Sequence, residues 1–150
     1  MAHLFETHLS VKDIDSSIAF YRDVVGLELA HVSPTRGAAF LWIGGRGHSM
    51  LGLWSHGSSP NNMKLHVAIA LELSAVLASI ASLKAGIQPL DFHGNPAVEP
   101  SVIAWMPAAS IFFRDLDGNL LEYLAMLPDE PQPTIDISTF SQWQAMRAAP

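Results

Sequence analysis

Acidic and imidazole side chains lie within three segments of the sequence. In each segment, apolar and polar residues alternate as is typical of strands. These side chains are Glu6 and His8 in residues 5–11, His66 in residues 65–71, and Glu122 in residues 120–124. Side chains two positions apart on a strand point to the same face, so Glu6 and His8 share one. Imidazole nitrogens and carboxylate oxygens that converge form a donor set for a divalent ion such as Mn²⁺, Ni²⁺, Zn²⁺ or Fe²⁺.

The same residues allow a simpler interpretation, in which none of them binds a metal. The chain has seven histidines, so chance alignments arise easily, and a single histidine on a strand is more often structural than a ligand. Glu6 follows Phe5, and Glu122 lies between Leu121 and Tyr123. A carboxylate buried in such surroundings needs a partner, whereas a carboxylate at a sheet edge faces solvent. Both interpretations follow from the residues alone.

The elements that position these residues occur twice along the chain, 60 positions apart. The matching pairs are Glu6 with His66, Val11 with Leu71, and Gly26 with Gly86. The first repeat predicts a strand, a helix and three strands at residues 5–11, 15–25, 27–32, 38–43 and 49–54. The second predicts the same order at residues 65–71, 74–84, 102–105, 109–114 and 120–124. Asp13 or Asp15 can cap the first helix and Gly26 can end it, so each half is a βαβββ module.

A proline-rich segment follows the second module. Pro128, Pro131 and Pro133 disfavour both helix interior and sheet pairing, so we expect an extended linker. A short helix near residues 138–147 should then pack through Phe140 and Trp143 on the body or on a partner chain. The predicted organisation is one domain over residues 1–127, with modules at about 4–55 and 64–126, and a linker with a tail helix over 128–150.

Composition limits the classes of partner. With 49% hydrophobic and 15% charged residues among 150, the chain can bury one core. A formal net charge of −6 and scattered basic residues leave no stripe for nucleic acid or an anionic membrane surface. The absence of cysteine excludes disulfides and thiolate metal sites. Residues 1–6 lack the features of a cleaved leader, and no apolar stretch is long enough to span a membrane. We expect a soluble cytoplasmic protein.

Two segments resemble the vicinal oxygen chelate superfamily, which contains glyoxalase I, fosfomycin resistance and bleomycin resistance proteins and extradiol dioxygenases. They are THLSVKDIDSSIAFYRDVVGL at residues 7–27 and FRDLDGNLLE at residues 113–122. The resemblance covers about residues 4–127. It implies an α+β fold in which two βαβββ modules form a curved mixed sheet around a central cavity. Members of this fold are often homodimers, which we also expect here.

The resemblance implies a site for one divalent metal ion, Ni, Zn, Mn or Fe, held by Glu6, His66 and Glu122. Glu6 lies five positions before Val11, at the family's first-strand ligand position, where histidine is common. His66 and Glu122 fall on the fifth-strand and eighth-strand ligand positions and are of the usual type. Three protein ligands leave positions for water and substrate, as a catalytic metal requires.

Glyoxalase I enzymes add a fourth ligand, a glutamate on the fourth strand, and its position here corresponds to Leu51 or Gly52. Neither residue can bind a metal through its side chain. His8 and His48 are candidates to supply the missing ligand. His8 could instead donate a hydrogen bond beside the metal or contact the substrate.

The reaction implied by the resemblance is of the lyase or isomerase type. The metal would chelate two adjacent oxygens of a small organic substrate, and Glu122 or Glu6 would move a proton as general base. Trp54, Trp105 and Phe113 are the expected walls of a partly apolar substrate pocket.

Three alternatives accompany this prediction. An extradiol-type dioxygenase needs two histidines and a carboxylate around iron, which Glu6 disfavours unless His8 replaces it. A thiol transferase would also use His66 and Glu122, with histidine as the usual first ligand. The third alternative is a metal-free binding module of the bleomycin resistance kind, which holds a small molecule or antibiotic without chemistry.

Overall fold

The computed structural model describes residues 3–56, 63–84 and 86–148, apart from the side chain of Lys84. Met1 and Ala2 belong to the segment that was expected to lack a cleaved leader. Both lie outside the described residues. Both βαβββ modules are present, so the predicted α+β class is confirmed. Within the described residues, no helix has the length and apolar character needed to cross a membrane.

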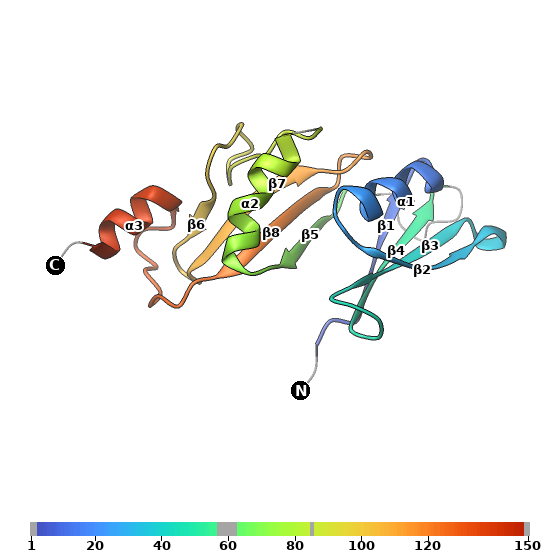
Figure 1. Cartoon of the computed structure of the whole chain (residues 1–150), viewed down its shortest axis with the longest axis horizontal. Coiled ribbons are helices and arrows are strands. Elements are labelled where there is room, and N and C mark those ends of the chain that lie inside the picture. Colours follow the sequence, from blue (N-terminus) through green and yellow to red (C-terminus); the bar gives the residue numbers. More distant parts are fainter. Residues whose placement is uncertain (1–2, 57–62, 85, 149–150) are drawn as a thin grey trace. The chain divides into compact units, whose positions relative to one another are not determined.

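The contacts divide the chain into two units. The first unit comprises Met1–Leu65 together with Asp115–Asn119, and the second comprises His66–Arg114 together with Leu120–Pro150. Each unit contains one of the two sheets and the helix that packs on it (Figure 1).

The first unit has a four-stranded mixed sheet in the order β1-β4-β3-β2. Its elements are β1 (Glu6–Val11), α1 (Ile14–Asp23), β2 (Glu28–Ser33), a 3-10 turn (Pro34–Arg36), β3 (Ala38–Ile43) and β4 (Ser49–Ser55). β1 runs parallel to β4, and the other pairs are antiparallel. Leu9 and Leu53 face each other across β1 and β4 and are fully buried beneath α1, which leaves the alternate side chains on a helix-free face.

Helix α1 begins and ends as its sequence predicts. The side chain of Asp13 accepts a hydrogen bond of 2.7 Å from the backbone N–H of Ser16, so Asp13 rather than Asp15 is the N-cap. At the other end, Gly26 has a φ of 82°, a conformation that side chains disfavour. It lets the N–H of Leu27 donate to the carbonyl of Tyr21 at 2.9 Å, which closes the last turn.

The second unit has a five-stranded mixed sheet in the order β5-β8-β7-β6-β9. Its elements are β5 (His66–Ala70), α2 (Leu73–Lys84), β6 (Ser101–Ile103), β7 (Ala108–Arg114), β8 (Leu120–Met126), β9 (Ile137–Thr139) and α3 (Phe140–Ala148). β5 runs parallel to β8, as β1 does to β4. In β5, Val67 and Ile69 are buried, while His66, Ala68 and Ala70 are exposed on the helix-free face.

The tail helix packs on the second unit. Trp143 is almost fully buried in a cluster with Val102, Ala104, Ala109 and Leu127, and its indole N–H donates to Asp129 at 2.8 Å. The predicted tail helix is therefore present as α3. Strand β9, which pairs with β6, was not predicted because three residues carry too little alternation to indicate a strand.

The chain has two tyrosines, and burial raises the pKa of both phenols. The pKa of Tyr123 rises to about 12, and that of Tyr21 is raised further because its hydroxyl also faces the negative charge of Asp115. Both pKa values lie above that of an unfolded tyrosine, so this contribution to stability is complete below about pH 10 and is lost as the pH rises above it. We expect phenolate absorbance to appear only together with loss of far-ultraviolet circular dichroism. A tyrosine that ionises near pH 10 in the folded protein would contradict the burial.

Candidate functional site

In the second unit, His66 and Glu122 form a pair on adjacent parallel strands. Glu122 of β8 pairs with Ala68 of β5, and His66 lies two residues earlier on the same face. The imidazole Nε2 of His66 is 3.0 Å from Oε2 of Glu122. The Glu122 side chain is 5% exposed and that of His66 is 49% exposed. The structure thus brings together two of the residues that the sequence analysis singled out.

The second oxygen of Glu122 lacks a partner. Oε1 is buried and accepts no hydrogen bond from any described residue. A buried carboxylate oxygen without a donor costs free energy, so proteins rarely keep one without a ligand or a function. Oε1 of Glu122 is consequently able to accept a cation or a hydrogen-bond donor.

Aromatic rings flank this pair. Phe112 pairs with Glu122 across β7 and β8, and its ring centroid is 6.2 Å from that of His66. Phe92 packs edge-on against Phe112 at 6.0 Å. Phe113 points to the opposite face, where it is fully buried against Tyr123 in the core. The pocket residue expected at Phe113 is thus replaced by Phe112, because the pairing of β7 with β8 fixes which of the two neighbours shares a face with Glu122.

In the first unit, Glu6 and His8 form a second carboxylate–imidazole pair. Oε1 of Glu6 is 2.9 Å from Nε2 of His8, and the two side chains are 34% and 38% exposed. The two atoms lie within hydrogen-bond distance, but their geometry is not that of a hydrogen bond. Nε2 of His8 is consequently buried without a hydrogen-bond partner among the described residues.

The His8 ring lies directly over Gly52. The two residues pair across β1 and β4, and a Cβ atom at position 52 would lie 2.5 Å from Cδ2 of His8. Leu51 points to the other face and is fully buried. Of the two positions considered for the absent fourth-strand ligand, Gly52 is the one on the face of His8.

Trp54 and Arg36 complete the helix-free face of the first unit. The Trp54 ring is 5.6 Å from that of His8. The Arg36 guanidinium lies 5.6 Å from the ring centroids of both Trp54 and Phe40, and its Nε donates to Ser33 at 3.1 Å. Trp54, which was expected to line a substrate pocket, therefore lies beside His8. Arg36 was missed, because only the strand pairing shows that this turn residue reaches the same face.

Two other expected residues lie away from these pairs within their own units. His48 is exposed in the turn before β4, with its ring 6.0 Å from that of His3 and its Nδ1 3.5 Å from the Ser49 hydroxyl. Trp105 lies in the turn after β6 and is 56% exposed. Neither contacts an imidazole–carboxylate pair of its unit by any described interaction.

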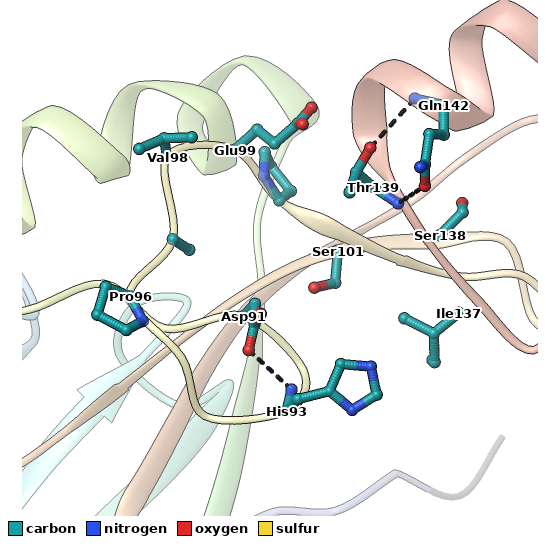
Figure 2. Close-up of a pocket in the computed structure, with 12 residues that line it drawn as sticks. Asp91, His93, Pro96, Val98, Glu99, Ser101, Ile137, Ser138, Thr139 and Gln142 are labelled. Carbon is teal, nitrogen blue, oxygen red and sulfur yellow. Dashed lines mark hydrogen bonds between the residues drawn. The ribbon is translucent and has the colours of Figure 1, made fainter.

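The second unit also has a cavity of about 310 Å³ near the tail helix (Figure 2). It is lined by residues 91–101 of the connection and β6 together with β9 and the start of α3. Several of its polar groups hold local structure: Asp91 accepts from the N–H groups of His93 and Asn95, whereas the Ser138 hydroxyl is buried without a hydrogen-bond partner among the described residues. Thr139 and Gln142 cap α3 reciprocally, as the dashed lines in Figure 2 show. This cavity includes neither His66 nor Glu122.

The donor atoms of both pairs fit a divalent ion. Two donors bound at right angles to one ion, with bonds of about 2.1 Å, lie about 3 Å apart. The distances in the two pairs are 2.9 and 3.0 Å, and each pair keeps a buried atom without a hydrogen bond. No group of three or more such side chains able to hold an ion is found among the described residues. Each unit thus presents two donors.

The chain matches the family model of the Glyoxalase/Bleomycin resistance protein/Dioxygenase superfamily over residues 1–123. It therefore belongs to this superfamily. No curated protein matches the chain significantly.

Solved structures show the same fold. An integron cassette protein from the mobile metagenome of Halifax Harbour sewage outfall is 28% identical, with a TM-score of 0.70 over 84% of this chain and 100% of that chain. A lactoylglutathione lyase from Agrobacterium tumefaciens is 24% identical, with a TM-score of 0.64 over 83% and 94% of the two chains. A glyoxalase/bleomycin resistance protein/dioxygenase from Nocardioides is 23% identical, with a TM-score of 0.62 over 88% and 89%. The last two likenesses show the fold alone.

Proposed function

We propose that the chain is a metal-dependent enzyme of this superfamily that acts on a small organic substrate through two adjacent oxygens. His66 and Glu122 would be two of the ligands, and Glu6 would be the third. The observation that carries this proposal is the buried Glu122 carboxylate, with one oxygen 3.0 Å from His66 and the other without a partner. Such an arrangement is costly in an apo protein and becomes favourable when a cation is bound.

The chemistry would be of the lyase or isomerase type, with a carboxylate that moves a proton. A bound divalent ion would supply Lewis acidity toward the substrate oxygens. Glu6 is the better general base of the two candidates, because its side chain is one-third exposed and a substrate can reach it, whereas Glu122 is enclosed. Phe112 and Phe92 would exclude water around Glu122.

The environment of the first unit favours a substrate with an anionic oxygen. Arg36 is held over two rings with one hydrogen bond to Ser33, which keeps its charge oriented on the face of Glu6 and His8. An arginine in this position suits a carboxylate or enolate oxygen. We also expect a cytoplasmic homodimer, as the family resemblance indicates.

A second candidate is the metal-free binding module. It is favoured by the finding that no group of three ligand side chains occurs in the described part of the chain. Under this alternative, the aromatic faces would hold a ligand, and the two pairs would be plain ion pairs. The thiol transferase alternative would also use His66 and Glu122, and the dioxygenase alternative would need two histidines and a carboxylate around iron, with His8 in place of Glu6.

Metal analysis separates the first two candidates. We expect never-chelated protein to contain about one transition-metal ion per chain, or to bind Mn²⁺, Ni²⁺ or Zn²⁺ on addition. The His66→Ala and Glu6→Ala variants should each lose most of this metal because each removes a ligand. His93→Ala removes another imidazole of the second unit, away from His66 and Glu122. This variant should keep the metal.

Absence of metal from the wild-type protein, with no binding on addition, would leave the binding module as the function. Retention of full metal by Glu6→Ala would instead remove Glu6 from the ligand set. An assay with methylglyoxal and glutathione then tests the glyoxalase reaction, and catechol or epoxide substrates test the dioxygenase and thiol transferase reactions.

A further inference from the structure

Arg36 is held in a fixed position without an acidic partner. It ends the 3-10 turn between β2 and β3, and Gly37 with a φ of 59° follows it. Its Nε donates to the Ser33 hydroxyl at 3.1 Å, and its guanidinium lies 5.6 Å from the ring centroids of both Phe40 and Trp54. Among the described residues Arg36 forms no ion pair and no further hydrogen bond. Its two terminal nitrogens are therefore open to a ligand.

The unsatisfied polar groups on this face of the first unit can all donate hydrogen bonds. Nε1 of Trp54 is buried without an acceptor, and an indole N–H, like a guanidinium, cannot accept. Nε2 of His8 also lacks a partner and donates when it carries the proton. The face consequently needs a ligand that brings acceptors. A carboxylate does so in the geometry that Arg36 favours, because its two oxygens accept parallel bonds from one guanidinium.

The rings around Arg36 indicate the rest of the ligand. Phe40 and Trp54 meet edge to face with centroids 6.1 Å apart, and the His31 ring stacks on Phe40 at 6.5 Å. The exposed guanidinium is planar, so its outer face can stack on a further ring while its edge binds a carboxylate. These surroundings suit a ligand whose carboxylate is attached to a flat aromatic or unsaturated body.

Glu6 limits the charge that such a ligand can carry. Its carboxylate lies on the same face of the sheet, 2.9 Å from Nε2 of His8. Arg36 offers one positive charge, and a second carboxylate on the ligand would face the negative charge of Glu6 instead. The face therefore favours a monocarboxylate over a dicarboxylate.

We propose that Arg36 binds the carboxylate of a small aromatic or unsaturated monocarboxylate on the helix-free face of the first unit. Every residue that carries this inference belongs to that unit. The inference deepens the proposed function by naming the substrate class, and it rests on that function only where the ligand is called a substrate. Binding itself needs no metal and can be measured without it.

The test is the affinity of the full chain for benzoate, measured by isothermal titration calorimetry with chelator present. Benzamide has the same shape without the charge, and we expect it to bind at least about tenfold more weakly than benzoate. Phthalate, which carries a second carboxylate, should also bind more weakly than benzoate. Nuclear magnetic resonance gives a second readout, in which benzoate should shift the Nε–H signal of Arg36 but not that of Arg46.

Variants of Arg36 separate carboxylate binding from a purely structural role. Arg36→Gln should bind benzoate about 10–100-fold more weakly and lose most of the preference over benzamide. Arg36→Lys keeps the charge but not the fork, and should recover only part of this loss. Arg46→Gln is the matched control, since Arg46 is an exposed arginine in the turn between β3 and β4. It should bind benzoate as the wild type does.

Three results would overturn the inference: no benzoate binding by the wild type at millimolar concentrations, unchanged affinity in Arg36→Gln, or an equal loss in Arg46→Gln. Phthalate that binds as tightly as benzoate would overturn the restriction to monocarboxylates. Metal bound by the wild type would leave the proposed function standing in each of these cases. Conversely, Arg36-dependent benzoate binding by a chain that binds no metal would overturn the metal-dependent function and leave this site in place.

Discussion

Replacing Glu122 by glutamine should stabilise the metal-free protein and abolish its response to metal. Glutamine keeps the shape and an oxygen that His66 can donate to, but removes a buried charge whose Oε1 has no partner. We expect the free energy of unfolding in the presence of chelator to rise by about 1–3 kcal/mol. Urea unfolding monitored by circular dichroism measures this change.

With metal present, the order of stability should reverse. A ligand at about 100 times its Kd stabilises the wild type by about 2.7 kcal/mol, while Glu122→Gln should gain little because a neutral amide is a poor ligand. Glu72→Gln, at an exposed position of the same unit, should change the stability by less than about 0.5 kcal/mol under both conditions. A Glu122→Gln variant that is less stable than wild type with chelator present would show that Glu122 is a structural ion-pair partner of His66.

The repeat made the architecture predictable. An offset of 60 positions shared by three landmarks fixed the βαβββ order, and capping residues such as Asp13 and Gly26 placed the helix ends within a turn. The structure pairs the strands that begin and end each module in parallel, which brings His66 beside Glu122. These features depend on local pattern and connectivity, which a sequence carries directly.

The identity of facing residues was not predictable in the same way. Strand pairing decides that Phe112 rather than Phe113 shares the face of Glu122, and that His8 lies over Gly52. Phe112 and Phe113 are both apolar and buried, so the hydrophobic pattern of the sequence does not tell which of them shares the face of Glu122. The sequence could therefore propose His8 as an alternative ligand, but could not show the space that Gly52 leaves for it.

Asp115 is a further residue whose role the sequence did not reveal. Its motif resembles a turn of the family, yet its buried carboxylate accepts four hydrogen bonds within the first unit. Oδ1 accepts from the backbone N–H groups of Asp117 and Asn119 at 3.0 and 2.8 Å. Oδ2 accepts from the Tyr21 hydroxyl and the Asn119 amide, both at 2.7 Å. Asp115 therefore joins its turn to helix α1.

Asp115→Ala should be the most destabilising single substitution considered, at about 3–5 kcal/mol, because it leaves four donors in a buried environment without an acceptor. Urea unfolding of the metal-free protein measures it. Asp115→Asn should recover only part of the loss, since its amide nitrogen would face two donors in place of Oδ2.

Tyr21→Phe isolates one arm of this network. It removes only the phenol that donates to Asp115 at 2.7 Å, and should cost about 1.5–3 kcal/mol, the range for a hydrogen bond to a charged group. The double variant with Asp115→Ala should lose less stability than the sum of the two single losses, because each substitution already breaks the same bond. Strict additivity would mean that Tyr21 stabilises α1 through ring packing alone, and that Asp115 acts only within its own turn.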